Sequence, residues 1–225
     1  MSESIKRLVE AGLVFGVQQD KNNLCLSRIT LGDGQLYLHT LQRYPLPTST
    51  IQVTEVMEAL ESSSTLVFLD LAWPGSPRRR LHIQLNTDTM LAKQFVLLCT
   101  GQHQSGSSFL NTKLLWLGNK GQPGEHVLGG DYQYNNGDGG APLLTHKYAY
   151  QYQESGSAGT VLSWYDPWTS KSTQFSITTT DRTDGRQWPR VFGKVVRGLE
   201  VLRAAVNHSD ITEVTVVDCG VVLTL

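Results

Sequence analysis

The 225-residue chain is poor in cysteine. Its three cysteines, Cys25, Cys99 and Cys219, are widely spaced and form no Cys-x-x-Cys pair. This spacing excludes a zinc knuckle and a thioredoxin-type motif. A chain of this length with so few cysteines is not a disulfide scaffold, so we expect buried free thiols in a reducing compartment.

The chain also lacks an excess of charge and any long hydrophobic run. Lys and Arg number 19 against 20 Asp and Glu, a net charge of −1, which excludes a global attraction for nucleic acid or anionic lipid. No apolar run approaches the roughly 18 residues that a membrane span needs. The first residues lack the charged and then apolar pattern of a secretory signal. We therefore expect an intracellular protein, cytoplasmic or nuclear, that is neither secreted nor bound to membranes.

Motifs for metal, phosphate or nucleophilic chemistry are missing as well. The six histidines show no paired ligand spacing, so no metal, no cofactor and no small-molecule substrate are expected. A Gly-rich stretch over residues 129–140 is not followed by the Gly-Lys-Ser/Thr of a phosphate loop, and Pro142 stands where a calcium loop would end in a carboxylate. These glycines are more typical of tight turns between strands.

Residues 1–61 have the pattern of a small α+β extension. The expected elements are a helix at residues 5–9, strands at 13–18, 24–31 and 36–41, and a helix with an apolar face of Val53, Val56, Met57 and Leu60. Asp33-Gly34 predicts a hairpin between the second and third strands. The apolar helix face needs a partner, and this makes it a candidate protein-binding surface. A polar linker over residues 62–65 is too short for the extension to move far from the rest of the chain.

Residues 66–225 read as a mainly β domain with two helices. Strands are expected at 66–72, 81–85 and 214–222, and helices after a cap at Thr87-Asp88 and near residues 197–206. The first helix should bury Leu91, Phe95 and Leu98. Two helices among many short strands favour a closed or nearly closed β structure with helices covering its ends.

The order of short segments in this second part resembles the cyclophilins, the β-barrel family of peptidyl-prolyl isomerases. The segments are Val67-Phe68-Leu69-Asp70, Phe95 to Gly101, Gly130-Asp131 with the glycines that follow, Val161-Leu162-Ser163, Ser172 to Thr178, Val191 to Val201, and Asp218-Cys219-Gly220. The resemblance implies a closed antiparallel β-barrel with two capping helices over residues 66–225. It does not cover the N-terminal sixty residues.

The groove that the resemblance implies has lost most of its functional residues. The family positions fall on Trp116 (arginine), Leu128 (glutamine), Asp166 (asparagine), Gln174 (glutamine), Ser176 (phenylalanine), Arg182 (tryptophan) and Gln187 (histidine). Only Gln174 is retained. A gapped alignment would bring Lys120 to the arginine position instead, but an ammonium on a flexible stem replaces a planar guanidinium poorly.

These losses predict a pseudo-enzyme. In the family, the arginine hydrogen-bonds the prolyl region and weakens the amide resonance that opposes rotation. Loss of one preorganised donor typically lowers a rate by about 10²–10³-fold. We therefore expect a catalytically inactive protein that acts as an interaction or scaffold subunit of a larger protein complex. The alternatives are a weak or specialised isomerase and an RNA- or chromatin-associated adaptor, although direct nucleic-acid binding is not favoured by the charge.

Aromatic residues map to the same groove or its rim. The candidate groove residues are Trp116, Trp164, Tyr165, Trp168, Gln174, Arg182 and Trp188. One interpretation is a new apolar binding surface, because Trp and Tyr are favoured at interface hot spots. The other is that these rings refill an emptied pocket as core. We further expect residues 1–61 to pack on the barrel and set partner choice, so that deleting them leaves residues 66–225 folded or modestly destabilised.

Overall fold

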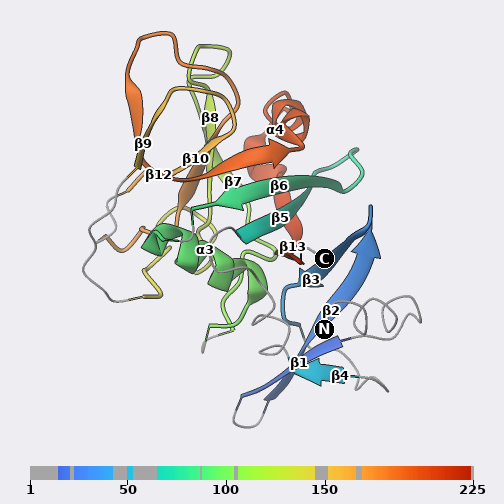
Figure 1. Cartoon of the computed structure of the whole chain (residues 1–225). Helices are drawn as coiled ribbons and strands as arrows, with labels where there is room; N and C mark the ends of the chain where they lie inside the picture. The colour runs from blue at the N-terminus through green and yellow to red at the C-terminus, as the bar shows by residue number, and fades with distance from the viewer. Residues whose placement is uncertain are drawn as a thin grey trace.

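The computed structural model describes residues 15–20, 23–42, 50–52, 65–86, 88–103, 106–144, 152–165 and 169–223, and these residues are mainly β (Figure 1). The strands are β1 (Phe15–Asp20), β2 (Asn23–Gly32), β3 (Gln35–His39), β4 (Thr50–Gln52), β5 (Thr65–Ala72), β6 (Arg79–Leu85), β7 (Leu114–Gly118), β8 (His126–Gly129), β9 (Tyr152–Ser155), β10 (Thr160–Ser163), β11 (Phe175–Thr178), β12 (Gln187–Arg197) and β13 (Thr215–Leu223). The helices are α3 (Met90–Thr100), α4 (Leu199–Ala205) and the short 3₁₀ turn η1 (Ile211–Glu213). No helix in this part of the chain is long and apolar enough to cross a membrane.

The strands from β5 onward form the expected antiparallel barrel. The sheet runs in the order β13-β5-β6-β12-β10-β11-β8-β7, and each of these neighbours is antiparallel. An isolated bridge between Lys113 and Thr215 joins the last strand to the first. Beside it the Leu114 N–H donates to the Val214 carbonyl at 2.9 Å, so the two ends of the run meet.

Helix α3 covers one end of the barrel and inserts Phe95 into it. The Phe95 ring lies 4.9 Å from Phe109 and 5.1 Å from Phe175, measured between ring centroids. The expected cap at Thr87-Asp88 is wrong, because the cap residue is Thr89, whose hydroxyl accepts the Ala92 N–H at 3.2 Å.

The buried face of α3 and the start of α4 follow the predicted pattern in part. In α3, Phe95 and Leu98 are buried as expected, but Leu91 is only half-buried. Helix α4 starts later than the pattern predicts, after Gly198 in the left-handed region at φ 85°.

The described part of the N-terminal extension continues the barrel sheet. Strand β3 pairs antiparallel with β13, and β2 pairs with β3 through its second half and with β1 through its first half. Asp33 and Gly34 form the β2–β3 turn, both with positive φ, as the sequence predicts. Figure 1 shows these blue strands beside the barrel at β13. The expected helices at residues 5–9 and 53–60, with Val53, Val56, Met57 and Leu60, lie outside the described residues. The domain boundary at 61–66 stays a prediction.

A buried ionic cluster joins the extension to the barrel. Asp218 on β13 accepts hydrogen bonds from Nδ1 of His39 at 2.8 Å, from Arg78 at 2.7 Å and from Arg28 at 3.2 Å. Arg78 also pairs with the buried Asp70. Burial alone would raise the pKa of Asp218, but the His39 hydrogen bond and the neighbouring positive charges hold it below its ordinary value. Two of these three donors come from the extension.

Candidate binding groove

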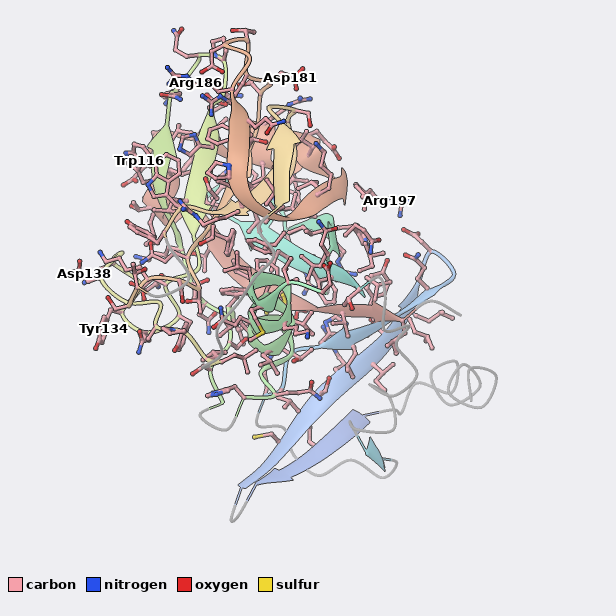
Figure 2. The ribbon with its side chains drawn as sticks, turned by 60° about the vertical axis from the view of Figure 1, so that its left-hand side comes forward. Trp116, Tyr134, Asp138, Asp181, Arg186 and Arg197 are labelled. Carbon is pink, nitrogen blue, oxygen red and sulfur yellow. The ribbon has the colours of Figure 1, made fainter. Side chains whose placement is uncertain are left out.

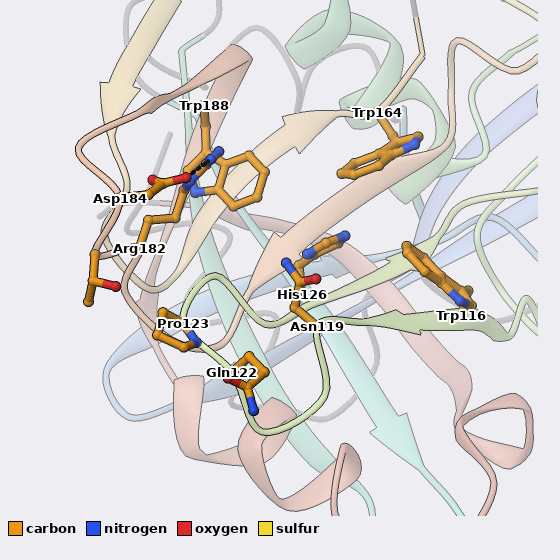
Figure 3. Close-up of a pocket in the computed structure, with 10 residues that line it drawn as sticks. Trp116, Asn119, Gln122, Pro123, His126, Trp164, Arg182, Asp184 and Trp188 are labelled. Atoms are coloured by element: carbon orange, nitrogen blue, oxygen red, sulfur yellow. Dashed lines mark hydrogen bonds and ion pairs between the residues drawn. The ribbon is translucent and has the colours of Figure 1, made fainter.

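A cavity of about 500 Å³ opens over strands β7, β8 and β12, where the resemblance places the family groove. Four aromatic rings line it: Trp116, His126, Trp164 and Trp188 (Figure 3). The structure thus brings together three of the five aromatic residues that the sequence mapped to the groove. Tyr165 does not line the cavity, and Trp168 lies outside the described residues.

His126, at the start of β8, is the centre of this aromatic group. Its ring stacks on Trp164 with centroids 4.8 Å apart and planes 21° from parallel. Its centroid lies 5.5 Å from that of Trp116 and 5.6 Å from that of Trp188. The interplanar angles are 71° and 69°, which is the edge-to-face arrangement. The residue is only 2% exposed, and its imidazole contacts all three of the other rings.

The protonation of His126 follows from its backbone contact. Its Nδ1 lies 2.9 Å from the Gly124 carbonyl oxygen, so Nδ1 carries the proton and donates. Burial lowers the pKa of His126, and this outweighs the opposing effect of the Gly124 hydrogen bond. The imidazole is therefore neutral near pH 7, with Nε2 as an acceptor.

Gly118, the last residue of β7, makes room for this ring. A Cβ placed on Gly118 would lie 2.5 Å from Cε1 and Nε2 of His126 and 2.8 Å from Cη2 of Trp116. Any larger residue would push the imidazole or the indole out of place. The glycine is thus part of the groove although it carries no side chain.

The three tryptophans are not equally exposed. Trp116 and Trp164 are 49% and 39% exposed, and Figure 2 shows Trp116 at the barrel surface. Trp188 is buried and packs with Leu162 and Val191. The interpretation as core therefore fits Trp188, and the interpretation as surface fits Trp116 and Trp164.

Arg182, which the resemblance aligns with the family tryptophan, makes side-chain contacts on two sides. Its guanidinium lies over the Trp188 ring at 4.3 Å and pairs with Asp184 through Nε at 2.9 Å and Nη2 at 2.5 Å. Its stem packs on Gly156 and Gly124, where an added Cβ would lie 2.4 Å and 3.1 Å from it. The Arg182 hydrogen bond lowers the pKa of Asp184 to about 2. Arg182 is the one cationic side chain that lines this cavity among the described residues.

The other mapped positions that the structure describes do not line the cavity. Gln174 is buried and donates to the carbonyls of Gly137 and Gly139 at 3.0 Å and 2.7 Å, so its amide holds the Gly-rich loop. The buried Ser176 hydroxyl donates to the Val127 carbonyl at 3.0 Å.

Of the remaining three mapped positions, the two that the structure describes do not line the cavity either. Leu128 is buried opposite Ser176 in the sheet, and Gln187 is exposed at the start of β12. Asp166 lies outside the described residues.

The Gly-rich loop is organised by the carboxylate of Asp131. It accepts backbone N–H groups at 2.8–3.1 Å from Gln133, Tyr134, Asn136, Gly137 and Gly139. Burial raises the pKa of Asp131, but these hydrogen bonds bring it below its ordinary value. The loop is thus a turn closed on its own side chain. Across the described ranges, no three His, Cys, Asp or Glu side chains are placed to hold a metal ion.

His126 was not among the predicted site residues, because the histidines were judged only by metal-ligand spacing. A usable signal was present. Residues i and i+2 of a strand share one face, so His126 lies on the same face of β8 as the mapped position Leu128.

Comparison with known proteins agrees with the fold. A model of the family "Cyclophilin type peptidyl-prolyl cis-trans isomerase/CLD" matches residues 70–221. Among solved structures, the Mimivirus cyclophilin is similar, with a TM-score of 0.53 and 20% sequence identity. The match covers 73% of this chain and 93% of the Mimivirus chain. This chain therefore belongs to the cyclophilin-type peptidyl-prolyl cis-trans isomerase family.

Proposed function

We propose that this chain is a cyclophilin-like protein without isomerase activity, whose groove binds a segment of a partner protein. The observation that carries the proposal is Trp116. It stands at the family's arginine position, and its indole packs on His126 and Trp164 where a guanidinium would face the substrate.

The proposed lack of catalysis follows from what the groove can donate. Rotation of an X–Pro amide must overcome a barrier of about 18–20 kcal/mol. An indole has one N–H and no charge, so it cannot replace a guanidinium in two directed hydrogen bonds. Arg182 cannot substitute either, because it is held between Asp184 and Trp188.

The proposed binding role is supported by the exposed rings. Trp116 and Trp164 present large apolar surfaces beside a cavity of about 500 Å³. Half-exposed tryptophans are unusual on a solvated surface and are typical of protein interfaces. Partners are therefore other proteins, in a complex where this chain is a scaffold subunit. The three cysteines are free thiols, which suits the reducing cytoplasm or nucleus.

A protease-coupled assay on an Ala-Pro peptide tests the first half of the proposal, with an active cyclophilin as reference. We expect a kcat/KM at least about 10²-fold below the reference. A rate near the reference would overturn the proposal and favour a specialised isomerase.

Co-purification from native extract tests the second half. We expect proteins that the wild-type chain captures to be lost with a Trp116→Ala/Trp164→Ala double variant. They should be kept with Tyr134→Ala, which removes a 66% exposed aromatic residue on the Gly-rich loop (Figure 2). Equal loss in both variants would contradict a role for the groove.

A further inference from the structure

Two buried polar atoms of the groove have no hydrogen-bond partner within the described chain. They are Nε2 of His126 and Nε1 of Trp188, on side chains that are 2% and 6% exposed. Unpaired buried polar atoms are rare in folded proteins and cost stability. Both residues line the same cavity, so a ligand could supply the missing partners.

The two atoms have opposite hydrogen-bonding roles. Nδ1 of His126 donates to the Gly124 carbonyl, which leaves Nε2 with a free lone pair. The indole N–H of Trp188 can only donate. The groove therefore offers one acceptor and one donor, on rings whose centroids lie 5.6 Å apart.

Trp116 packs against the ring that carries the acceptor, with centroids 5.5 Å apart. A Cβ on Gly118 would meet Nε2 of His126 at 2.5 Å and Cη2 of Trp116 at 2.8 Å, so this nitrogen and the edge of the indole both lie against Gly118. Trp116 is half-exposed, and Figure 3 shows it at the margin of the cavity, across from Trp188. Rotation of Trp116 about its side-chain bonds would uncover the imidazole.

We propose that the groove takes a primary carboxamide, the side chain of a glutamine or asparagine in the partner segment, and not a proline. The carboxamide N–H donates to Nε2 of His126, and its C=O accepts from Nε1 of Trp188. This inference rests on the proposed function, in which the groove binds a peptide segment.

The geometry of a primary carboxamide favours it over other groups. Its N–H and C=O can point to the same side, whereas a trans backbone peptide directs them to opposite sides. Two hydrogen bonds of about 2.9 Å let one such group bridge two neighbouring rings. A proline has no N–H, so it would leave the His126 acceptor buried and unpaired. A site built on hydrogen bonds discriminates strongly against ligands that lack them.

Titration with a peptide series tests the inference on the full chain. The peptides are acetyl-Ala-Ala-X-Ala-Ala N-methylamides with X as Gln, Met, Glu or Pro, so the capping group adds no primary carboxamide. We expect Gln to bind at least about 10-fold more tightly than Met or Pro, and to shift the Trp188 indole N–H signal in ¹H–¹⁵N spectra.

Two variants locate the effect. His126→Phe keeps an aromatic ring without the acceptor, and Trp188→Phe removes the donor. Each should bring Gln and Met within about 2-fold of each other, while Trp73→Phe, outside the groove, should leave the preference unchanged. The indole shift of the wild-type chain stays informative if a variant does not fold.

The outcomes separate this inference from the proposed function. Tighter binding of the Pro peptide, or a Gln preference that survives both variants, would overturn the carboxamide inference and leave a peptide-binding groove. No binding of any peptide at millimolar concentration, with partner capture that still depends on Trp116, would overturn the inference alone. If that capture also fails, both are overturned.

Discussion

The imidazole of His126 lies nearly parallel to the indole of Trp164, with centroids 4.8 Å apart and an angle of 21° between the planes. The pair comes from β8 and from the residue just after β10, strands that are not neighbours in the sheet. The stack therefore joins the residue after β10 to the start of β8. The position of the imidazole depends on Gly118, because a Cβ on that residue would lie 2.5 Å from the ring.

Replacing Gly118 by alanine should disturb this stack directly. The new Cβ would lie 2.5 Å from His126, and relief of that contact requires the ring or the strand to move. Overpacking of this kind typically costs about 1–3 kcal/mol. We expect Gly118→Ala to lower the free energy of unfolding by this amount in urea and to abolish Trp116-dependent partner capture.

Gly32→Ala is the matched control for that variant. Gly32 also ends a strand, but a Cβ there meets only the Tyr37 ring, at an ordinary 3.4 Å. It should change stability by less than about 0.5 kcal/mol. Equal effects of the two substitutions would show that strand propensity, and not the His126 contact, determines the result.

The fold was predictable because the sequence features that indicate it are either local turns or short segments in a fixed order along the chain. Asp33-Gly34 specified a hairpin through its positive φ angles, and the segment order specified the barrel. The cap of α3 was misplaced because Thr87, Asp88 and Thr89 are all competent caps, and only the helix start decides which hydroxyl meets Ala92.

The groove was predictable only in part. The resemblance predicted that Trp116, Trp164 and Trp188 lie close together, although they come from distant segments. It assigns each residue a place in the barrel, which the periodicity of the sequence cannot do. It could not supply the contact between Arg182 and Trp188, because the positions of these side chains do not follow from the order of segments. Nor could it indicate that the His126 imidazole would become the centre of the aromatic group.

Stability should fall as the pH drops from about 7.5 to 5.5. Burial lowers the pKa of His39, His82 and His126 below the ordinary value of about 6.5. In this window the unfolded chain takes up protons that the folded chain does not, so stability is full near pH 7.5 and is lost progressively as the pH falls through the unfolded value of about 6.5. Each proton contributes a slope of up to about 1.4 kcal/mol per pH unit.

Urea unfolding at a series of pH values measures that slope. His126→Phe removes one of the three groups and should make the slope shallower, with the largest change between pH 6.5 and 5.5. A stability that stays level or rises on acidification would show that these histidines accept protons in the folded chain.

Replacing Asp218 by asparagine should destabilise the protein strongly. The carboxylate is 3% exposed and is shared by His39, Arg28 and Arg78. Removing one partner of a buried ionic cluster costs about 3–5 kcal/mol. We expect the lower end of this range in urea unfolding, because the two arginine side chains are 42% and 44% exposed and can be solvated.

Asp138→Asn provides the comparison for Asp218→Asn. Asp138 is a surface carboxylate, 76% exposed, that pairs with Lys171 at 3.5 Å. Its substitution should cost less than about 0.5 kcal/mol. If the two asparagine variants were equally stable, the buried cluster would contribute nothing to the attachment of the extension.

Deleting residues 1–64 should cost more stability than the sequence alone predicts. The deletion removes β3 and so leaves the edge of β13 from Gly220 to Leu223 without its hydrogen-bonded neighbour. It also removes His39 and Arg28, two of the partners of Asp218. A loss of about 4 kcal/mol or more corresponds to a fall of at least about 8 °C in melting temperature at this chain length.

A deletion of residues 1–14 is the control for this truncation, because it keeps β1 to β4 and the whole ionic cluster. We expect it to melt within about 3 °C of the full chain, while the chain that begins at Thr65 melts much lower or without a cooperative transition. The measurement is thermal unfolding followed by circular dichroism.

If residues 65–225 melted as cooperatively and as high as the full chain, the strand pairing between β3 and β13 would be dispensable. The extension would then be a separable module, and the apolar helix face predicted at Val53, Val56, Met57 and Leu60 could be tested for partner choice by truncation. If the truncated chain is unstable as we expect, partner choice has to be tested in the full chain, with Val56→Ser and Met57→Ser against the wild type.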